Sequence, residues 1–366
     1  MIELMIGILI SLICTLAIMA AFAVFEGQKR TTSSGDDAQQ NGSFSLYELE
    51  RQIRTAGSGL VQGKSYGLWG CPINAVTAGT AQLPKAVAAP FAIWPATTRA
   101  MPVLIAKGGV DGSGNALPDV IGVVSGNPAG RVFKAIVSST PDAVTVGVTN
   151  SYGIFAGDYL LGTRTDGSCA VGLATNTPTS PANSITLDAN NSLGTGMTNA
   201  TNVYDLGNAP VLSLFGVNTL TGSLVTYDLL QRPINGAAPG AIPIADGIVQ
   251  IKALYGIHDG TSGIADQNYI DKWVQPVGVW AIGALTATPI AASNAVNQIQ
   301  AVRVAVVAQS RLPERITDYK TGATSLTLFG DLPAALQYTI TTQPQYRYKV
   351  YDTTIPVRNA MISKWF

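Results

Sequence analysis

Histidine is almost absent from this 366-residue sequence, which contains a single one, His258. A lone histidine excludes most histidine-dependent catalytic triads, metal sites that need two histidines, and HExxH proteases. The chain also lacks a P-loop, a dinucleotide-binding fingerprint, a CxxCH haem motif and an EF-hand loop, and the spacing of its acidic residues selects no catalytic pair of carboxylates. We therefore expect the protein not to be an enzyme, and His258 to be a surface loop residue.

Charge is also scarce, at 12% of residues, and 22 lysines and arginines balance 22 aspartates and glutamates. A balanced chain has no net field that would attract nucleic acid or an anionic surface, so no nucleic-acid partner is expected. Hydrophobic residues make up 47% of the chain, which is ample for a sizeable core. This profile is more typical of secreted β-rich proteins than of cytosolic enzymes.

Cysteine occurs only three times. Cys14 lies in an apolar run and is most simply a small buried hydrophobic residue. Cys71 and Cys169 remain, and they either form a disulfide in an oxidising compartment or stay as two separate buried thiols.

Residues 4–25 form an uncharged apolar run. As a helix with a rise of about 1.5 Å per residue, this run is long enough to cross a hydrocarbon core of about 30 Å. A signal peptide would have a shorter apolar region, a basic flank before it and a small-residue cleavage site after it, and none of these is present. The run is instead followed by Glu26, Lys29 and Arg30, which can anchor the end of a membrane span at the interface.

Glu3 stands at the head of this apolar run. A carboxylate there is costly in lipid unless it is paired, so it is a functional candidate. The nearest cation is the α-amino group of Met1, from the same chain or from a neighbouring copy. We expect Glu3 and Met1 to act together in assembly.

The start of the chain, IELMI (2–6) followed by an uninterrupted apolar helix, resembles the mature N-terminus of type IV pilins and of the related type II secretion pseudopilins. The resemblance implies that a peptidase removes a basic leader, that the new N-terminus is methylated, and that Glu3 pairs with a neighbour's N-terminal amine. The family glutamate is normally fifth, so either two residues are missing before Met1 or the processing register differs. The absence of a leader suggests a mature form. Leu12 and Ala20 replace the helix-breaking residues of many major pilins, which weakens the expectation that this helix melts on assembly.

Residues 28–56 are polar with apolar positions at helical spacing, so the helix is expected to continue to about residue 57. Gly57 provides its stop, and a bend is expected at Gly35 or at Asn41 and Gly42, where helix propensity is low. The face laid on a globular domain should contain these residues: Phe44, Tyr47 or Leu49, Ile53 and Ala56.

Beyond residue 60, short apolar or alternating runs are separated by turn residues, which predicts an antiparallel β domain. The fold class is therefore α+β, with a helical segment at 1–57 (apolar at 1–25, amphipathic at 26–57) and a β-rich domain at 58–366. A break between two subdomains is expected near 188–200, and no helix comparable to the first is expected. The predicted strands are 120–124, 143–148, 159–161, 184–187, 202–206, 211–217, 223–230, 250–255, 298–308 and 347–356.

Several segments resemble, in order, PilW-type minor pilins. They are LYELERQIR (46–54) with the following Gly57 and Cys71, GDYLL (157–161) with Cys169, IADGI (244–248) with Ile251, Leu254, Tyr255 and Gly256, AVRVAVV (301–307), and the closing segment 351–359. Each motif is short, but their order makes the resemblance fairly specific. It also places Cys71 and Cys169 at family-like positions.

Two Asp-Gly loops could supply oxygen ligands to calcium. One contains Asp111 and Asn115 and extends to Asp119; the other contains Asp259 and extends to Asp266, with Asp271 just beyond. The simpler interpretation of both loops is a plain turn, because turns need aspartate and glycine. No other cofactor is expected.

These observations predict a structural subunit of a type IV pilus or pilus-like extracellular filament, assembled by packing of N-terminal helices. It would lie in a bacterial inner membrane before assembly and in an extracellular pilus afterwards. Its partners would be copies of itself, other pilins and the pilus assembly platform in the inner membrane. The alternatives are a filament-tip adhesin, a type II secretion pseudopilin or, against the absence of any catalytic constellation, an enzyme tethered by one helix.

Overall fold

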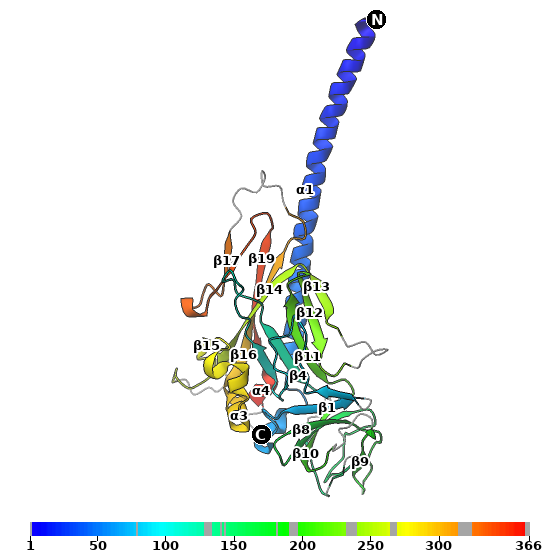
Figure 1. The fold of residues 1–366 in the computed structure, drawn as a ribbon, viewed down its shortest axis with the longest axis vertical. Helices are drawn as coiled ribbons and strands as arrows, with labels where there is room; N and C mark the ends of the chain where they lie inside the picture. The colour runs from blue at the N-terminus through cyan, green and yellow to red at the C-terminus, as the bar shows by residue number, and fades with distance from the viewer. Residues whose placement is uncertain are drawn as a thin grey trace.

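The protein consists of one long helix and a β-rich body, and the N-terminus of the helix lies far from that body (Figure 1). The computed structural model describes residues 2–77, 80–127, 134–139, 141–142, 144–180, 182–189, 197–231, 240–263, 269–313 and 324–362. A long N-terminal helix followed by a large, mainly antiparallel β domain confirms the predicted α+β class.

Helix α1 spans Ile2–Thr55 without interruption. The helix continues without a break through Gly35, Asn41 and Gly42, where a bend was predicted, and its contact with the body from Ser34 onward supports these weak helix formers. The predicted stop is confirmed: Gly57 has a φ of +78°, a left-handed conformation that favours glycine after a helix. Its N–H donates to the carbonyl of Val124 at 2.8 Å, which ties the end of the helix to the body.

Three main sheets build the body. The first has the order β2 (Thr80–Leu83), β1 (Ile73–Thr77), β8 (Cys169–Leu173), β7 (Tyr159–Arg164), β10 (Ala200–Gly207) and β5 (Lys134–Ile136). The second has the order β13 (Ile242–Asp246), β12 (Ser223–Asp228), β11 (Val211–Asn218), β4 (Val120–Ser125) and β3 (Val103–Ala106). The third has the order β15 (Lys272–Val274), β14 (Ile248–Ile257), β16 (Ile299–Gln309) and β19 (Tyr348–Pro356). Neighbouring strands are antiparallel except for the parallel pair β1 and β8.

Smaller elements complete the body. Two hairpin-like pairs are β17 (Ser325–Leu328) with β18 (Tyr338–Thr341) and β6 (Thr145–Gly147) with β9 (Ser184–Thr186). Short helices are α2 (Ile282–Leu285), α3 (Pro289–Gln298) and α4 (Arg358–Ile362), and 3-10 turns occur at Val61–Tyr66, Gly278–Trp280 and Ala334–Leu336. None of these helices is comparable in length to α1, as expected.

Every range predicted as a strand overlaps an observed strand. Sequence reasoning missed β1–β3, β5, β8, β13, β15, β17 and β18, which lie among loop-forming residues. It also missed α3, which begins with Pro289 at a position that favours proline and is capped by Thr288, whose hydroxyl accepts from the N–H of Ala291 at 3.1 Å. Of the expected break near 188–200, residues 190–196 lie outside the described residues, and Ala200 begins β10, which returns to the sheet of β7 and β8. The division into two subdomains stays a prediction.

The largest core lies between α1 and the second and third sheets, and it extends to Cys71 and Cys169. A separate small core fills the region of β6, β9 and β10, which lies at the end of the body opposite to the N-terminus (Figure 1). A third lies between the third sheet and the β17–β18 pair. The body thus holds the C-terminal half of α1 and leaves the N-terminal half uncovered.

Candidate assembly site: the N-terminal helix and its attachment

The apolar segment of α1, residues 2–25, makes no contact with the body. Its large hydrophobic side chains are all exposed, from 54% at Ile6, the lowest value, to 75% at Ile2, the highest. Within the described part of the chain, α1 is the one helix long and apolar enough to cross a membrane. Exposed apolar surface of this size is unstable in water, so it needs either lipid or the apolar surface of other proteins. Cys14 is exposed together with this segment rather than buried within the protein.

Glu3 lies in the first turn of α1 and is exposed. A carboxylate near a helix N-terminus interacts favourably with the helix dipole. Met1, its expected partner, lies outside the described residues. The intermolecular role of Glu3 and Met1 therefore stays a prediction.

Small side chains form most of the face that α1 lays on the body. The buried residues of this face are Ser34, Ala38, Gly42, Ser45, Leu49, Ile53 and Ala56. Of the residues expected on it, Leu49, Ile53 and Ala56 are confirmed. Phe44, which is 48% exposed, is wrong, and of the alternatives Tyr47 and Leu49 it is Leu49 that is buried, since Tyr47 is 61% exposed. Hydrophobicity suggested the aromatic positions, but close approach of a helix to a sheet requires small residues.

Gly42 marks the closest approach of α1 to β19. A Cβ at this position would lie 2.2 Å from Cε2 of Tyr351 and 3.0 Å from Cβ of Ala308. The Tyr351 ring therefore occupies the space that any larger residue at position 42 would need. This contact seats the helix on the third sheet.

Hydrogen bonds hold the helix in this seat. Tyr351 Oη donates to the carbonyl of Gln39 at 2.9 Å, and Lys349 Nζ donates to Gln39 Oε1 at 3.1 Å. Nearer to the N-terminus, the N–H of Leu312 donates to Ser34 Oγ at 3.1 Å. Ser34 is the first residue of α1 with such a contact, and it lies about one helical turn after Arg30, the last of the basic residues that follow the apolar segment.

The last turn of α1 is fixed by helix α4. Asn359 Nδ2 donates to the carbonyls of Thr55 and Ala56 at 3.2 and 3.0 Å. These carbonyls would otherwise lack partners at the C-terminus of the helix. The C-terminal segment thus packs against the end of α1 and satisfies its free carbonyls.

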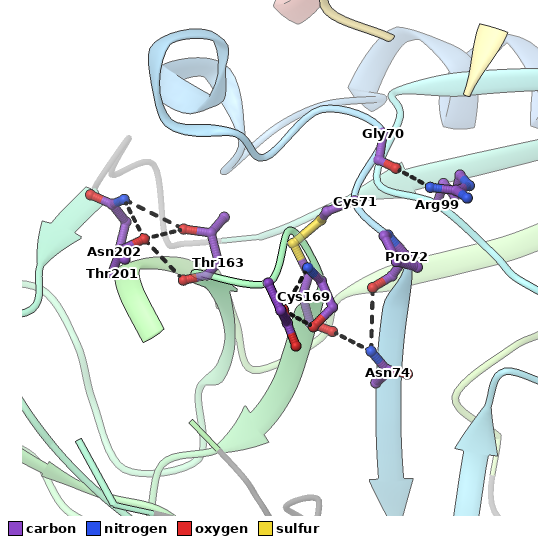
Figure 2. Close-up of a disulfide and its surroundings, with 11 residues drawn as sticks. Gly70, Cys71, Pro72, Asn74, Arg99, Thr163, Cys169, Thr201 and Asn202 are labelled. Atoms are coloured by element: carbon purple, nitrogen blue, oxygen red, sulfur yellow. Dashed lines mark hydrogen bonds between the residues drawn. A yellow bond between two sulfur atoms is a disulfide. The ribbon is translucent and has the colours of Figure 1, made fainter. Parts of the chain in front are cut away.

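Cys71 and Cys169 form a disulfide, the pairing that the sequence suggested (Figure 2). Both residues are buried, and the bond joins the turn before β1 to the start of β8. The N–H of Cys169 donates to the carbonyl of Pro72 at 2.9 Å, and Asn74 Nδ2 donates to the Cys169 carbonyl at 3.2 Å. The disulfide therefore reinforces the only parallel strand contact within the three main sheets as described.

The first Asp-Gly loop is closed by hydrogen bonds to the Asp111 carboxylate, and calcium binding there stays a prediction. Asp111 Oδ1 accepts from the N–H groups of Ser113 and Asn115 at 2.8 Å, and Asp111 Oδ2 accepts from Asn115 Nδ2 at 2.9 Å. The side-chain hydrogen bond from Asn115, with the backbone bonds, lowers the pKa of Asp111. The side chain of Asp119 does not lie beside the Asp111 carboxylate, because Asp119 is fully buried in the body.

Asp119 instead forms a buried ion pair with Lys252, a contact that sequence reasoning missed. Lys252 Nζ lies 2.8 Å from Asp119 Oδ1, and both side chains are 0% exposed. Asp119 also accepts from the N–H groups of Gly108 and Ala253 at 2.8 and 3.0 Å, and Lys252 donates to the Leu117 carbonyl at 2.6 Å. Burial raises the pKa of the Asp119 carboxyl, and the Lys252 ammonium opposes this shift. A lysine inside an apolar strand was the available signal.

The second Asp-Gly loop is also closed by its own donors. Asp259 Oδ2 lies 2.5 Å from Lys272 Nζ, and Thr261 donates to Asp259 Oδ1, so that these groups lower the pKa of Asp259. Asp271 accepts from two loop N–H groups, and His258 Nδ1 lies 3.2 Å from it, so His258 is partly buried rather than a free surface residue. Asp266 lies outside the described residues. Within the described ranges, no three His, Cys, Asp or Glu side chains are grouped as metal ligands.

Comparison with known proteins finds a family match that covers the C-terminal motifs of the chain. Residues 215–359 match the family model described as type IV pilus-assembly protein W. A solved structure, the type IV-like pilin TTHA1219 from Thermus thermophilus, is 12% identical over 57% of this chain and 86% of its own length. Its TM-score of 0.23 is too low for this likeness to support a shared fold by itself. No curated protein matches the sequence of this chain. The family match contains three of the segments that carry the resemblance, namely 244–256, 301–307 and 351–359, and so confirms the resemblance to PilW-type proteins over residues 215–359 of this chain.

Proposed function

We propose that this chain is a structural subunit of a type IV pilus or a pilus-like extracellular filament. It is anchored in the bacterial inner membrane by residues 2–25 and then packs this segment against the same segment of other subunits. The observation that carries the proposal is the exposure of 54% to 75% at every large hydrophobic residue of the segment. The match of residues 215–359 to a pilus-assembly family agrees with it.

The apolar segment explains both the membrane stage and the filament stage. Burying one large aliphatic or aromatic side chain contributes about 1.5 to 3 kcal/mol, so the segment as a whole gains tens of kcal/mol, to an order of magnitude, by leaving water. It can leave a bilayer only if comparable burial is available, and neighbouring copies of the same helix provide it. The body then lies outside the helix bundle, and the balanced charge of the chain gives no strong field that would itself drive association.

Glu3 is the assembly residue in this proposal. An unpaired carboxylate in a dry bundle would cost several kcal/mol, roughly, so Glu3 needs the amine of Met1 from its own chain or from a neighbour. Replacing Glu3 by Ala should leave the body folded and abolish incorporation into filaments. Glu26→Ala is the matched control, because that carboxylate lies at the polar end of the segment and should be dispensable. Normal incorporation of the Glu3→Ala chain would count directly against the proposal.

The division of labour between helix and body gives a second test. A chain truncated before Glu26 should be soluble and should not polymerise, since it lacks the segment that requires burial. Size-exclusion chromatography and electron microscopy measure both properties. Long fibres formed by the truncated chain alone would make the body the polymerising element.

The proposal includes both a bulk subunit and a minor subunit that primes assembly. The alternatives of a tip adhesin and a pseudopilin of a type II secretion system use the same helix. Electron microscopy of purified filaments labelled on the body distinguishes these roles, because labels repeat along the shaft for a bulk subunit and occur at one end for a tip protein.

A further inference from the structure

Two pairs of opposite charges lie on α1 just after the apolar segment. Lys29 and Arg30 form the basic pair, and Asp36 and Asp37 form the acidic pair. All four side chains are exposed, and in the described part of the chain none of them takes part in an ion pair. Charges nearer to the C-terminal end of α1, by contrast, pair within the helix at spacings of three and four residues.

The spacing explains why these pairs do not meet within one chain. Each basic residue precedes an acidic residue by seven positions, which is two turns of helix or about 10.5 Å. Side chains on one helix interact at separations of three or four positions, so a separation of seven is out of reach. A second, parallel copy of the helix displaced by two turns would bring the basic pair of one copy level with the acidic pair of the other.

We propose that neighbouring copies of this chain pack their helices in parallel with an axial displacement of two helical turns, and that Lys29 and Arg30 of one copy face Asp36 and Asp37 of the next. This inference rests on the proposed filament function and adds its register. The proposed binding partner of this part of α1 is a second copy of the same chain.

Other displacements fit the charges less well. Helices in register would place like charges opposite each other, which is destabilising. A displacement of one turn would bring only Glu26 level with the basic pair and would leave both aspartates beside Thr32 and Ser33. A displacement of four turns would place Asp36 beside Glu50. The two-turn displacement pairs all four charges and opposes no like charges along α1.

The surroundings leave room for this contact. Positions 26–30 and 32–33 are exposed, and Ser34 is the first residue of α1 that the body buries. The same displacement brings exposed Phe44 level with Arg51 and exposed Tyr47 level with Arg54, where a guanidinium can lie on an aromatic ring. In a helical array each copy has several neighbours at different axial offsets, so this contact and the Glu3 contact involve different pairs of copies.

Charge reversal tests the register. The full chain carrying Lys29→Asp and Arg30→Asp should fail to form filaments, and so should the chain carrying Asp36→Lys and Asp37→Lys. Co-expression of the two variants should restore filaments, because each basic stretch then faces an acidic one. Glu26→Lys is the matched control: it should assemble normally, since the two-turn displacement places position 26 beside Ser33 and Met19.

Disulfide trapping tests the same register without charge reversal. In a Cys14→Ser background, Arg30→Cys with Asp37→Cys should give a ladder of covalent oligomers in oxidised filaments, and the one-turn pair Glu26→Cys with Arg30→Cys should not. Absence of filaments from the unmodified chain and its partner pilins would contradict the proposed function itself. Filaments from the unmodified chain together with normal assembly of both reversed variants, or a ladder from the one-turn pair alone, would overturn the register.

Discussion

The seat of α1 on the third sheet depends on the absence of a side chain at Gly42. Alanine there would place a Cβ 2.2 Å from Cε2 and 2.7 Å from Cδ2 of Tyr351, and 3.0 Å from Cβ of Ala308. To reach an ordinary contact of 3.4 Å, the ring edge must move by 3.4 − 2.2 = 1.2 Å. Such a movement strains the hydrogen bond from Tyr351 to the Gln39 carbonyl.

Opposing effects then set the magnitude. Overpacking of this kind costs about 1 to 3 kcal/mol, and weakening the hydrogen bond costs about 0.5 to 1.5 kcal/mol. Replacing glycine by alanine inside a helix returns about 1 kcal/mol. Gly42→Ala should therefore lower the free energy of unfolding by about 0.5 to 3.5 kcal/mol. Gly35→Ala is the matched control, because a Cβ there meets nothing within 4 Å, and it should be stabilising by up to about 1 kcal/mol.

Thermal unfolding of the full chain in detergent micelles, followed by tryptophan fluorescence, measures these changes. The two glycine substitutions should shift the transition in opposite directions. In a Tyr351→Ala background, which removes the ring, Gly42→Ala should no longer destabilise, and this coupling isolates the contact. If Gly42→Ala proves as stabilising as Gly35→Ala in the native background, the helix does not approach β19 as closely as the structure places it.

The body supports three further predictions. Asp119→Ala should destabilise the protein by about 3 to 5 kcal/mol in chemical unfolding, because it leaves a buried lysine unpaired, whereas Asp119→Leu combined with Lys252→Met should cost much less; an equal cost would refute the role of the pair. Intact-mass measurement without reduction should show Cys71 and Cys169 as a disulfide, which closes a loop with a sequence separation of 98 residues and contributes up to roughly 4 to 5 kcal/mol; two free thiols in fresh protein would contradict it. The pKa of Asp271 lies below its usual 3.8, first because the Ser262 hydroxyl donates to it and then because the N–H groups of Asp259 and Gly260 do. Hydrogen-exchange protection of these two amides should therefore be full above pH 3.8 and lost as the pH falls through the folded-state pKa of Asp271. Asp271→Asn should abolish this loss.

Local patterns predicted much of this protein. The apolar run of residues 4–25, the continuation of the helix and its stop at Gly57 are properties of consecutive residues, so sequence reasoning could find them. The same holds for the strands with long apolar or alternating runs, such as β4, β11 and β16. Short strands among glycine and proline residues, such as β1 to β3, lack that signal and depend on pairing with distant partners.

Only the tertiary structure decided which face of α1 is buried. The predicted positions Leu49, Ile53 and Ala56 are buried, but nearer to the N-terminus the body covers Ala38, Gly42 and Ser45 rather than Phe44, because a helix can approach a sheet this closely only through small residues. Hydrophobicity measures the gain from burial, and it does not report the distance between two surfaces.

Contacts between residues far apart in sequence also decided where the candidate calcium ligands lie. By itself, the sequence of Asp111, Asn115 and Asp119 favoured a plain turn and left a cation loop as the alternative. The fold takes Asp119 away from the loop and pairs it with Lys252, which follows it by 133 positions in the chain. The sequence determined that residues 4–25 form an apolar run long enough to cross a membrane as a helix, because that is a property of consecutive residues. The tertiary structure decided that the body leaves this segment uncovered, and it decided which charges are paired within the body and which remain exposed on α1, because both depend on contacts between residues far apart in sequence.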